Sequence, residues 1–261
     1  MKALAARRQD RRAPIVLLLL ALLLTGGLYA VLAPTSAGAA TVKADATDIA
    51  TGEKLFQANC ATCHGPSAAG TASGPSLIGV GAAAVDFQVG TGRMPAQMNG
   101  PQIEAKPVQF EQEQINQLAA FVASLGDGPA IPTAEMVDPA LGNASNGMAI
   151  FRTNCAMCHN AVGAGGALSQ GKFAPNLWST TPTHLYEAML TGPQSMPVFN
   201  DANITPEEKR DIIAFIDLQG GASPGGLTLG ALGPVSEGLW AWVIGMGLLI
   251  GAAVWIGAKS S

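Results

Sequence analysis

Two long apolar runs bracket the chain, and shorter helical patterns lie between them. Residues 14–33 (PIVLLLLALLLTGGLYAVLA) and 239–257 (LWAWVIGMGLLIGAAVWIG) contain no charged side chain. A run of about 20 apolar residues can cross a bilayer as a helix, so both are predicted to be transmembrane. Between them, apolar residues at helical spacing predict helices near 52–60, 115–125 and 205–218. No convincing strand pattern occurs, so the predicted fold class is all-α.

The residues around the apolar runs predict how each one is oriented. Five basic residues precede the first run, so this end should stay in the cytoplasm. Trp240, Trp242 and Trp255 lie near the ends of the second run, as in interfacial aromatic belts, and Lys259 follows it. SAGAA (36–40) also permits a cleaved signal peptide in place of the first helix. We expect a retained anchor, and both readings export the residues between the runs.

The charge balance argues against one class of function. Only 12% of the 261 residues are charged, and the net charge is −4. Between residues 13 and 258, eight Lys or Arg stand against 17 Asp or Glu. A nucleic-acid-binding protein needs basic clusters in its folded part, so no nucleic-acid partner is expected. The acidic body suits basic or neutral partners, or serves only solubility.

The region between the apolar runs contains an internal repeat. GEKLFQANCATCH (52–64) aligns with GMAIFRTNCAMCH (147–159) at an offset of 95 residues. Three shorter matches follow in the same order: GPSL with APNL, RMP with SMP, and QLAAFVASL with DIIAFIDL. One small domain therefore occurs twice. The first copy has an extra loop, NGPQIEAKPVQF, before its last helix.

Each copy contains the CxxCH spacing, which attaches c-type haem. In a helix, two cysteines three residues apart face the same way, and a histidine four residues after the first cysteine lies beside them. Two thioethers could hold a porphyrin while the imidazole binds its iron. The predicted cofactor-binding residues are Cys60, Cys63, His64, Cys155, Cys158 and His159.

Three other uses of the paired cysteines explain the sequence less well. A disulfide is plausible outside the cytoplasm but leaves the histidine that follows in both copies without a role. A thioredoxin-like motif needs βαβ patterning, which is absent. Zinc needs four ligands, and one CxxCH supplies three. In addition, a domain of about 80 residues with few large apolar side chains lacks a sufficient core, which a buried porphyrin would supply.

Each haem iron has a second axial position, and methionine there raises the reduction potential and suits electron transfer. Met94 and Met196 each precede a proline at matching places in the repeat. The predicted iron ligands are therefore His64, Met94, His159 and Met196. His184 is the rival ligand in the second copy, within a predicted helix that has no counterpart in the first.

Other residues are expected to support the haem sites. Pro75 and Pro175 should lie on the proximal side, where a carbonyl could accept a hydrogen bond from the haem histidine. Met98 and Met189 are expected to fill the core. Candidate contacts for the haem propionates are Arg93, Trp178 and Tyr186.

On these motifs, each repeat resembles a class I cytochrome c domain, with CxxCH, a Pro-Leu turn, a Met-Pro loop and a closing helix. The whole layout resembles the QcrC family, the dihaem cytochrome c subunits of the actinobacterial cytochrome bcc menaquinol–cytochrome c reductase. The expected divisions are a basic N-terminus with an anchor or signal segment (1–34), a first cytochrome c domain (48–126), a linker (127–142), a second cytochrome c domain (143–220), a Gly-rich linker (221–237) and a transmembrane helix (238–258).

This resemblance implies a respiratory electron carrier with two covalently bound haem c groups. The chain would be an electron-transfer subunit of a quinol–cytochrome c reductase, a translocase, without substrate chemistry of its own. The implied partners are a cytochrome b subunit, a Rieske iron–sulfur subunit and a cytochrome c oxidase. The haem on Cys60 and Cys63 would accept electrons, and the haem on Cys155 and Cys158 would donate them. The protein would be a multi-pass cell-membrane protein with its haem domains outside.

Two alternative functions remain open at this point. A dihaem cytochrome c peroxidase would need one open or histidine-bound iron, and hence a role for His184. A cytochrome subunit of a periplasmic dehydrogenase or of another oxidase would keep both haems and change only the partners.

Overall fold

A computed structural model describes residues 13–32, 45–98, 100–221 and 234–259. Three segments with sequence-based expectations lie outside these ranges: the basic N-terminal residues, the small-residue segment 36–40 and most of the Gly-rich linker. The expectations for these segments therefore stay predictions.

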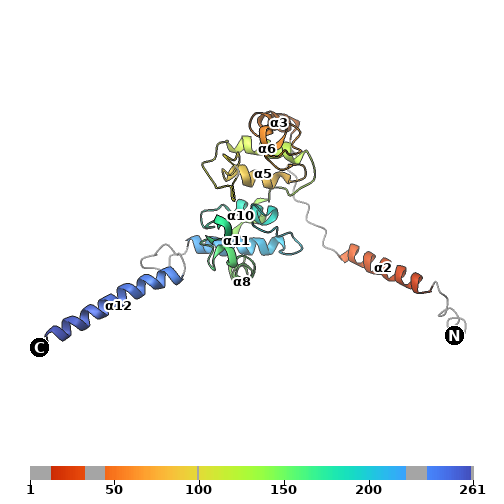
Figure 1. Cartoon of the computed structure of the whole chain (residues 1–261). Helices are drawn as coiled ribbons and strands as arrows, with labels where there is room; N and C mark the ends of the chain where they lie inside the picture. The colour runs from red at the N-terminus through yellow and green to blue at the C-terminus, as the bar shows by residue number, and fades with distance from the viewer. Residues whose placement is uncertain (1–12, 33–44, 99, 222–233, 260–261) are drawn as a thin grey trace, which may run out of the picture. The chain divides into compact units, whose positions relative to one another are not determined.

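Apolar helices occur at both ends of the described chain (Figure 1). In α12 (Pro234–Lys259), the segment Gly238–Ala258 is long and apolar enough to span a membrane. In α2 (Ala13–Leu32), the apolar stretch Ile15–Gly27 is shorter. Among the described residues, α12 is therefore the one clear spanning candidate. The expected N-terminal span does not reach that standard.

The first repeat forms four helices: α3 (Ala46–Asn59), α4 (Ala61–His64), α5 (Gly81–Gly90) and α6 (Gln112–Ala123). Helix α3 packs on α6, where the ring centroids of Phe56 and Phe121 lie 5.2 Å apart. At this crossing, a Cβ on Gly52 would lie 2.0 Å from the carbonyl oxygen of Gln117. Only glycine therefore permits the two backbones to approach so closely.

The second repeat builds the same arrangement from α8 (Ala144–Asn154), α9 (Ala156–His159), α10 (Pro182–Thr191) and α11 (Pro206–Gly221). The rings of Phe151 and Phe215 lie 5.3 Å apart, and a Cβ on Gly147 would lie 1.9 Å from the carbonyl oxygen of Asp211. In the expected linker, α7 (Ala134–Val137) and η2 (Pro139–Leu141) pack against α11.

The second repeat also contains two short strands, which the sequence does not predict. β1 (Gly166–Ala167) and β2 (Phe173–Ala174) pair antiparallel, with Gly166 opposite Ala174. They are connected through η3 (Ser169–Gly171). The expectation of an all-α fold is wrong at these residues, because a two-residue strand is too short to show an alternating pattern. All the other regular elements of the described chain are helices.

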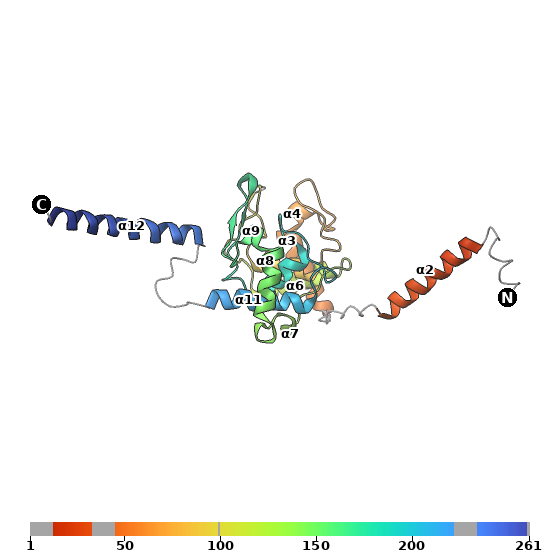
Figure 2. The same cartoon turned by 90° about the horizontal axis from the view of Figure 1, so that it is seen from below.

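Helices α5 and α10 are equivalent in the two repeats and contact each other. The helices follow the order α3, α6, α5, α10, α11, α8, and each contacts the next (Figure 1). Figure 2, seen from below, places the second repeat in front of the first.

Helices α5 and α10 also end in the same way. The side-chain hydroxyls of Thr91 and Thr191 each donate to the carbonyl four residues earlier, at 2.5 and 2.8 Å. The expectation that the helix of His184 has no counterpart is therefore wrong.

The extra loop of the first repeat reaches the second repeat. The side-chain amide of Gln102 donates to the carbonyl of Phe173 (2.9 Å) and accepts from its N–H (2.8 Å). The N–H of Ile103 donates to Oε1 of Gln194 (3.2 Å). The extra loop, which only the first repeat has, therefore adds hydrogen bonds between the two domains.

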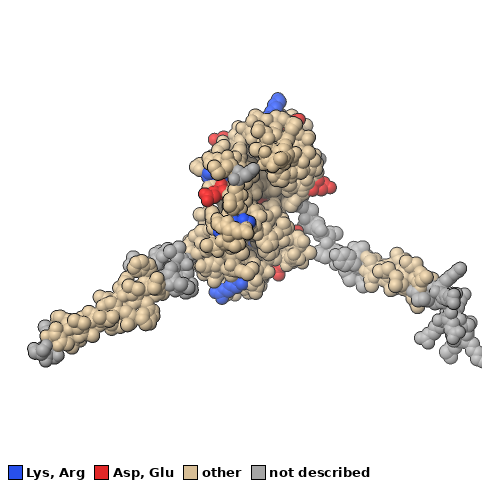
Figure 3. Space-filling view, viewed as in Figure 1, with Lys and Arg blue, Asp and Glu red and all other residues tan. Residues whose placement is uncertain are grey.

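Charged side chains are few and scattered on the face shown in Figure 3. A small number of polar and charged residues are instead buried: His64, Asp86, His159, Glu187 and Lys209. The two histidines belong to the CxxCH motifs. The other three are buried ionisable residues that the motifs do not account for.

Candidate functional site

Each CxxCH motif begins at a break between two helices. Helix α3 ends at Asn59, and Cys60 (φ −120°) separates it from α4. Cys155 (φ −117°) separates α8 from α9 in the same way. The expectation that Cys60 continues the first helix is therefore wrong, since the chain turns at this residue.

Backbone hydrogen bonds still hold each motif together beyond the break. The N–H of His64 donates to the carbonyl of Cys60 (3.0 Å), and that of His159 to the carbonyl of Cys155 (2.9 Å). No disulfide joins the four cysteines, all of which belong to the described residues. Burial, and then the neighbouring cysteine, raises the pKa of Cys60 and of Cys155 to about 11. As free thiols, these two side chains are thus protonated at neutral pH.

Both motif histidines are buried and bound to a proline carbonyl. His64 is 9% exposed and His159 is 8% exposed. Nδ1 of His64 lies 2.7 Å from the carbonyl oxygen of Pro75, and Nδ1 of His159 lies 3.1 Å from that of Pro175. The expected hydrogen bonds from the two histidines to the proline carbonyls are confirmed. Because a carbonyl can only accept, Nδ1 carries the proton and Nε2 keeps its lone pair for a metal.

A glycine with positive φ supports the histidine from behind in both repeats. Gly70 (φ 89°) and Gly165 (φ 84°) donate their N–H to the carbonyls of His64 (2.8 Å) and His159 (2.9 Å). A Cβ on Gly70 would lie 2.6 Å from the backbone nitrogen of Ser76, so a larger residue would displace the proline segment. The positive φ favours glycine as well. Burial lowers the pKa of His159, and the Pro175 carbonyl partly opposes this.

Met94 and Met196 lie in the loops that follow α5 and α10. Each is partly buried and packs on the core cluster that the first cysteine of its own motif also contacts. In each domain, the structure thus places the predicted methionine ligand and the first motif cysteine against the same core. Binding of iron by the methionine stays a prediction. Met189, 4% exposed, is a core residue as expected, whereas Met98 is 78% exposed and the expectation for it is wrong.

The three candidate propionate contacts have different surroundings. Nε1 of Trp178 donates to the carbonyl of Val162 (2.8 Å), and the guanidinium of Arg93 lies 4.9 Å from the ring centroid of Phe87. Tyr186 is completely buried, and its hydroxyl has no hydrogen-bond partner in the described structure. The propionate contacts themselves stay predictions.

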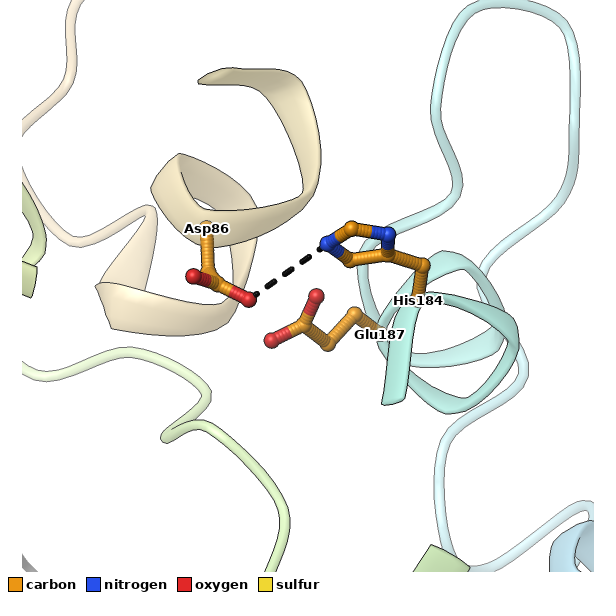
Figure 4. A group of neighbouring side chains, drawn as sticks. All are labelled: Asp86, His184 and Glu187. Atoms are coloured by element: carbon orange, nitrogen blue, oxygen red, sulfur yellow. Dashed lines mark ion pairs between the residues drawn. The ribbon is translucent and has the colours of Figure 1, made fainter. Parts of the chain in front are cut away.

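His184 lies at the contact between the two repeats (Figure 4). Its Nε2 is 3.6 Å from Oδ2 of Asp86 on α5, and its ring stands edge-on to Phe87 with centroids 6.0 Å apart. The rival haem ligand is thus engaged with the first domain. Sequence reasoning missed Asp86 and its neighbour Glu187. The available signal was a single acid inside each apolar helix, AAAVDFQV and HLYEAML.

The duplicated helix arrangement, with a CxxCH turn and a buried histidine in each half, defines a tandem cytochrome c. Residues 49–126 match a family model described as cytochrome c. Residues 142–216 match one described as cytochrome C oxidase, cbb3-type, subunit III. A cytochrome c holds its haem covalently, so the two domains carry two haem c groups. The CxxCH segments agree with this assignment.

Curated relatives extend the similarity to nearly the whole chain. The cytochrome bc1 complex cytochrome c subunit of Mycobacterium tuberculosis (strain ATCC 25618 / H37Rv) is 46% identical over 252 residues, 94% of this chain and 90% of that protein. The protein of the same name from Corynebacterium efficiens is 43% identical over 279 residues, 99% of this chain and 94% of that protein. The chain belongs to the family of cytochrome bc1 complex cytochrome c subunits.

Proposed function

We propose that this chain is a membrane-anchored dihaem cytochrome that carries electrons from quinol-oxidising cytochrome b and Rieske subunits to a terminal cytochrome c oxidase. One observation carries the proposal: both CxxCH segments end in a buried histidine whose Nδ1 donates to a proline carbonyl. The names of the relatives, which are subunits of a bc1 complex, support the quinol-oxidising partner. Reductase activity would then belong to the complex, and this chain would transfer electrons from the complex to the oxidase.

The chain's own residues would hold and tune two haems. Bound haem supplies one-electron cycling between Fe(III) and Fe(II). Cysteine pairs attach each porphyrin, and the neutral Nε2 of each motif histidine binds iron from one side while a methionine sulfur closes the other. The proline carbonyl fixes each imidazole and increases its basicity. The proposed cysteine and axial residues are Cys60, Cys63, His64 and Met94 in the first domain, and Cys155, Cys158, His159 and Met196 in the second.

The proposed arrangement in the membrane uses both terminal helices. The span Gly238–Ala258 in α12 supports a C-terminal anchor, and α2 would be a second, retained anchor after the basic N-terminus. The cytochrome domains, 48–126 and 143–220, would then lie outside the cell membrane, where c-type haem is exposed to its partners. By order in the chain, the first domain would accept electrons from the Rieske subunit, and the second would donate them to the oxidase.

Haem counting in single variants tests the sites. The wild-type chain, purified from membranes, should contain two haems after denaturing electrophoresis with haem staining. Cys60→Ala and Cys155→Ala should each impair attachment in one domain only, because each removes one thioether. Two haems in both variants, or one haem in the wild type, would contradict the assignment.

Carbon monoxide binding tests the methionine ligands. Met94→Ala and Met196→Ala should each leave haem attached, lower one reduction potential and open one iron to carbon monoxide. Met98→Ala is the matched control, because Met98 is exposed, and it should bind none. Failure of both ligand variants to bind carbon monoxide would sink the ligand assignment.

Co-purification tests the partners. A tagged chain should bring down a cytochrome b subunit, a Rieske protein and a cytochrome c oxidase from solubilised membranes. Recovery of a dehydrogenase in place of the Rieske protein would favour another cytochrome subunit. Peroxide turnover by the wild-type chain would favour the peroxidase alternative. The mass of the N-terminus decides whether the first apolar segment is retained.

A further inference from the structure

Three side chains of metal-ligand type meet where α5 of the first domain contacts α10 of the second. Asp86 comes from α5, and His184 and Glu187 come from α10; one ligand atom of each lies within 4.8 Å of the others. Figure 4 shows the two carboxyl groups and the imidazole gathered around a common space. We propose that these residues bind one divalent cation of the zinc class, which joins the two cytochrome domains. The proposed haem chemistry uses none of the three.

The burial of two carboxyl groups is the first argument for a cation. Asp86 is 5% exposed and Glu187 is 0% exposed. With both acids ionised, neither Glu187 oxygen has a hydrogen-bond partner in the described structure, and a proton on Glu187 would bond it to Asp86. No Lys or Arg in the described residues forms an ion pair with either acid. Removing an unpaired carboxylate from water costs several kcal/mol. The site therefore calls for a positive charge or a proton.

The protonation of the two acids follows the same logic. Burial, and then the charge of Asp86, raises the pKa of Glu187 to about 10. Burial also raises the pKa of Asp86, but hydrogen bonds from His184, Gln112 and Glu187, together with the charge of His184, outweigh it and leave this pKa below its usual value. Without a cation, Glu187 is thus a neutral acid beside an ionised one. An ion of charge +2 would balance both carboxylates once Glu187 gives up its proton.

The spacing of the polar atoms is the second argument. Nε2 of His184 and Oδ2 of Asp86 are 3.6 Å apart, beyond the usual length of a hydrogen bond. Two ligands of a tetrahedral zinc ion, each about 2.0–2.1 Å from the metal, lie about 3.3 Å apart. Nε2 of Gln112 donates to Oδ1 of Asp86 (3.2 Å), which leaves Oδ2 directed at the imidazole. Such outer hydrogen bonds orient metal ligands.

The chemistry of the donors selects the class of ion. One imidazole nitrogen and two carboxylate oxygens suit zinc, with a fourth position left for water. Calcium and magnesium prefer six or more oxygen ligands, and copper(I) prefers sulfur.

A glycine makes the approach of His184 possible. A Cβ on Gly90 would lie 2.9 Å from Nε2 of His184, so alanine at this position would displace the ring. Because the ligands come from both domains, a bound ion would hold α5 against α10.

Zinc content of the full haem-loaded chain tests the proposal. The chain is purified in detergent, stripped with a chelator, dialysed against zinc chloride and then against zinc-free buffer. We expect about one zinc per chain, measured by mass spectrometry against quantitative amino-acid analysis. X-ray absorption at the zinc edge should show nitrogen and oxygen neighbours without sulfur, which separates this site from cysteines that have lost haem.

Isosteric variants assign the zinc to the cluster. Glu187→Gln and Asp86→Asn should each lower the retained zinc at least about 10-fold, with haem content unchanged to show that the fold persists. Gly90→Ala should lower it while keeping all three ligands. Glu113→Gln, an exposed acid on α6, should retain wild-type zinc. Less than a tenth of a zinc per wild-type chain, or unchanged zinc in both acid variants, would overturn the proposal in favour of a shared proton.

Discussion

The two cytochrome domains agree closely on their haem sides and differ where they contact each other. Both have a glycine at the first helix crossing, an aromatic pair beside it, and a histidine bound to a proline carbonyl. Helices α5 and α10, which form the contact between the domains, differ in sequence. When Thr91 is matched with Thr191, Phe87 of α5 corresponds to Glu187 of α10. The parts that build a haem pocket are thus duplicated, and the parts that form the domain contact are specific to each copy.

The largest effect is expected at the duplicated helix crossings. Gly52→Ala and Gly147→Ala each place a Cβ about 2 Å from a carbonyl oxygen of the closing helix. The backbones must separate, so each variant should lose at least about 3 kcal/mol of unfolding free energy in its own domain. Thermal unfolding followed by the haem absorbance of each domain measures this loss.

The control for this pair is Gly221→Ala, because nothing lies within 4 Å of that position. It should unfold like the wild type. If Gly147→Ala also unfolded like the wild type while Gly52→Ala did not, the two crossings would not be equivalent.

A smaller effect is expected where the closing helices differ in their cores. Lys209 is fully buried on α11, and its ammonium donates to Asp201 (2.7 Å) and to the carbonyl of Ile204 (2.6 Å). The equivalent residue of α6 is Ile115, which is 2% exposed. Lys209→Met should destabilise the second domain by about 1–2 kcal/mol, because the Ile204 carbonyl loses its donor. The exposed Asp201 can regain water, which limits the loss.

Ile115→Met is the matched change in the first domain. It keeps an apolar side chain of similar volume and should cost less than about 1.5 kcal/mol. Chemical denaturation of both variants gives the comparison. If both variants lost the same unfolding free energy, the hydrogen bonds of the Lys209 ammonium would make no net contribution to stability.

Sequence patterns predicted the parts of this protein that are local or repeated. The offset between the copies identified the domains, and the CxxCH spacing identified their cofactor. The matched prolines, Pro75 and Pro175, could be placed behind the histidines because each follows its motif at a short distance. A threonine followed by proline and two acids is typical of a helix start, and the hydroxyl of Thr205 accepts from the N–H of Glu208 (3.3 Å) at the start of α11.

The parts that could not be predicted depend on contacts between distant segments. Helix α5 was missed because GAAAVDFQVG has no apolar stripe and begins and ends with glycine. Without α5, no partner for His184 could be predicted, and its place as a rival haem ligand, a propionate-side histidine or a surface histidine stayed open. The cluster of Asp86, His184 and Glu187 joins positions about 100 residues apart, and no local pattern encodes such a meeting. Met98 was misjudged because burial of a loop methionine depends on the same distant packing.

Loss of the loop contact should change the domain interface without changing either domain. Gln102→Ala removes two hydrogen bonds to the backbone of Phe173, together worth about 1–2 kcal/mol locally. Amide exchange of Phe173 should therefore accelerate about 10-fold, while the unfolding of both domains stays near wild type. Gln57→Ala, which removes a bond within the first domain, should leave Phe173 unchanged. Unchanged exchange in Gln102→Ala would show that the loop does not protect this strand.

The smallest effect sharpens the comparison at the start of the closing helices. Glu111 with Gln114, and Thr205 with Glu208, form capping boxes at equivalent positions of α6 and α11. Thr205→Ala and Glu111→Ala should each cost about 1 kcal/mol, because a first-turn N–H loses its acceptor. Denaturant midpoints of each domain measure the two losses. Because the hydrogen bonds of each cap lie within the start of its own helix, each loss should stay within its own domain. A shift of both midpoints in one variant would mean that the domains unfold as a single unit, and the interface would then contribute to both.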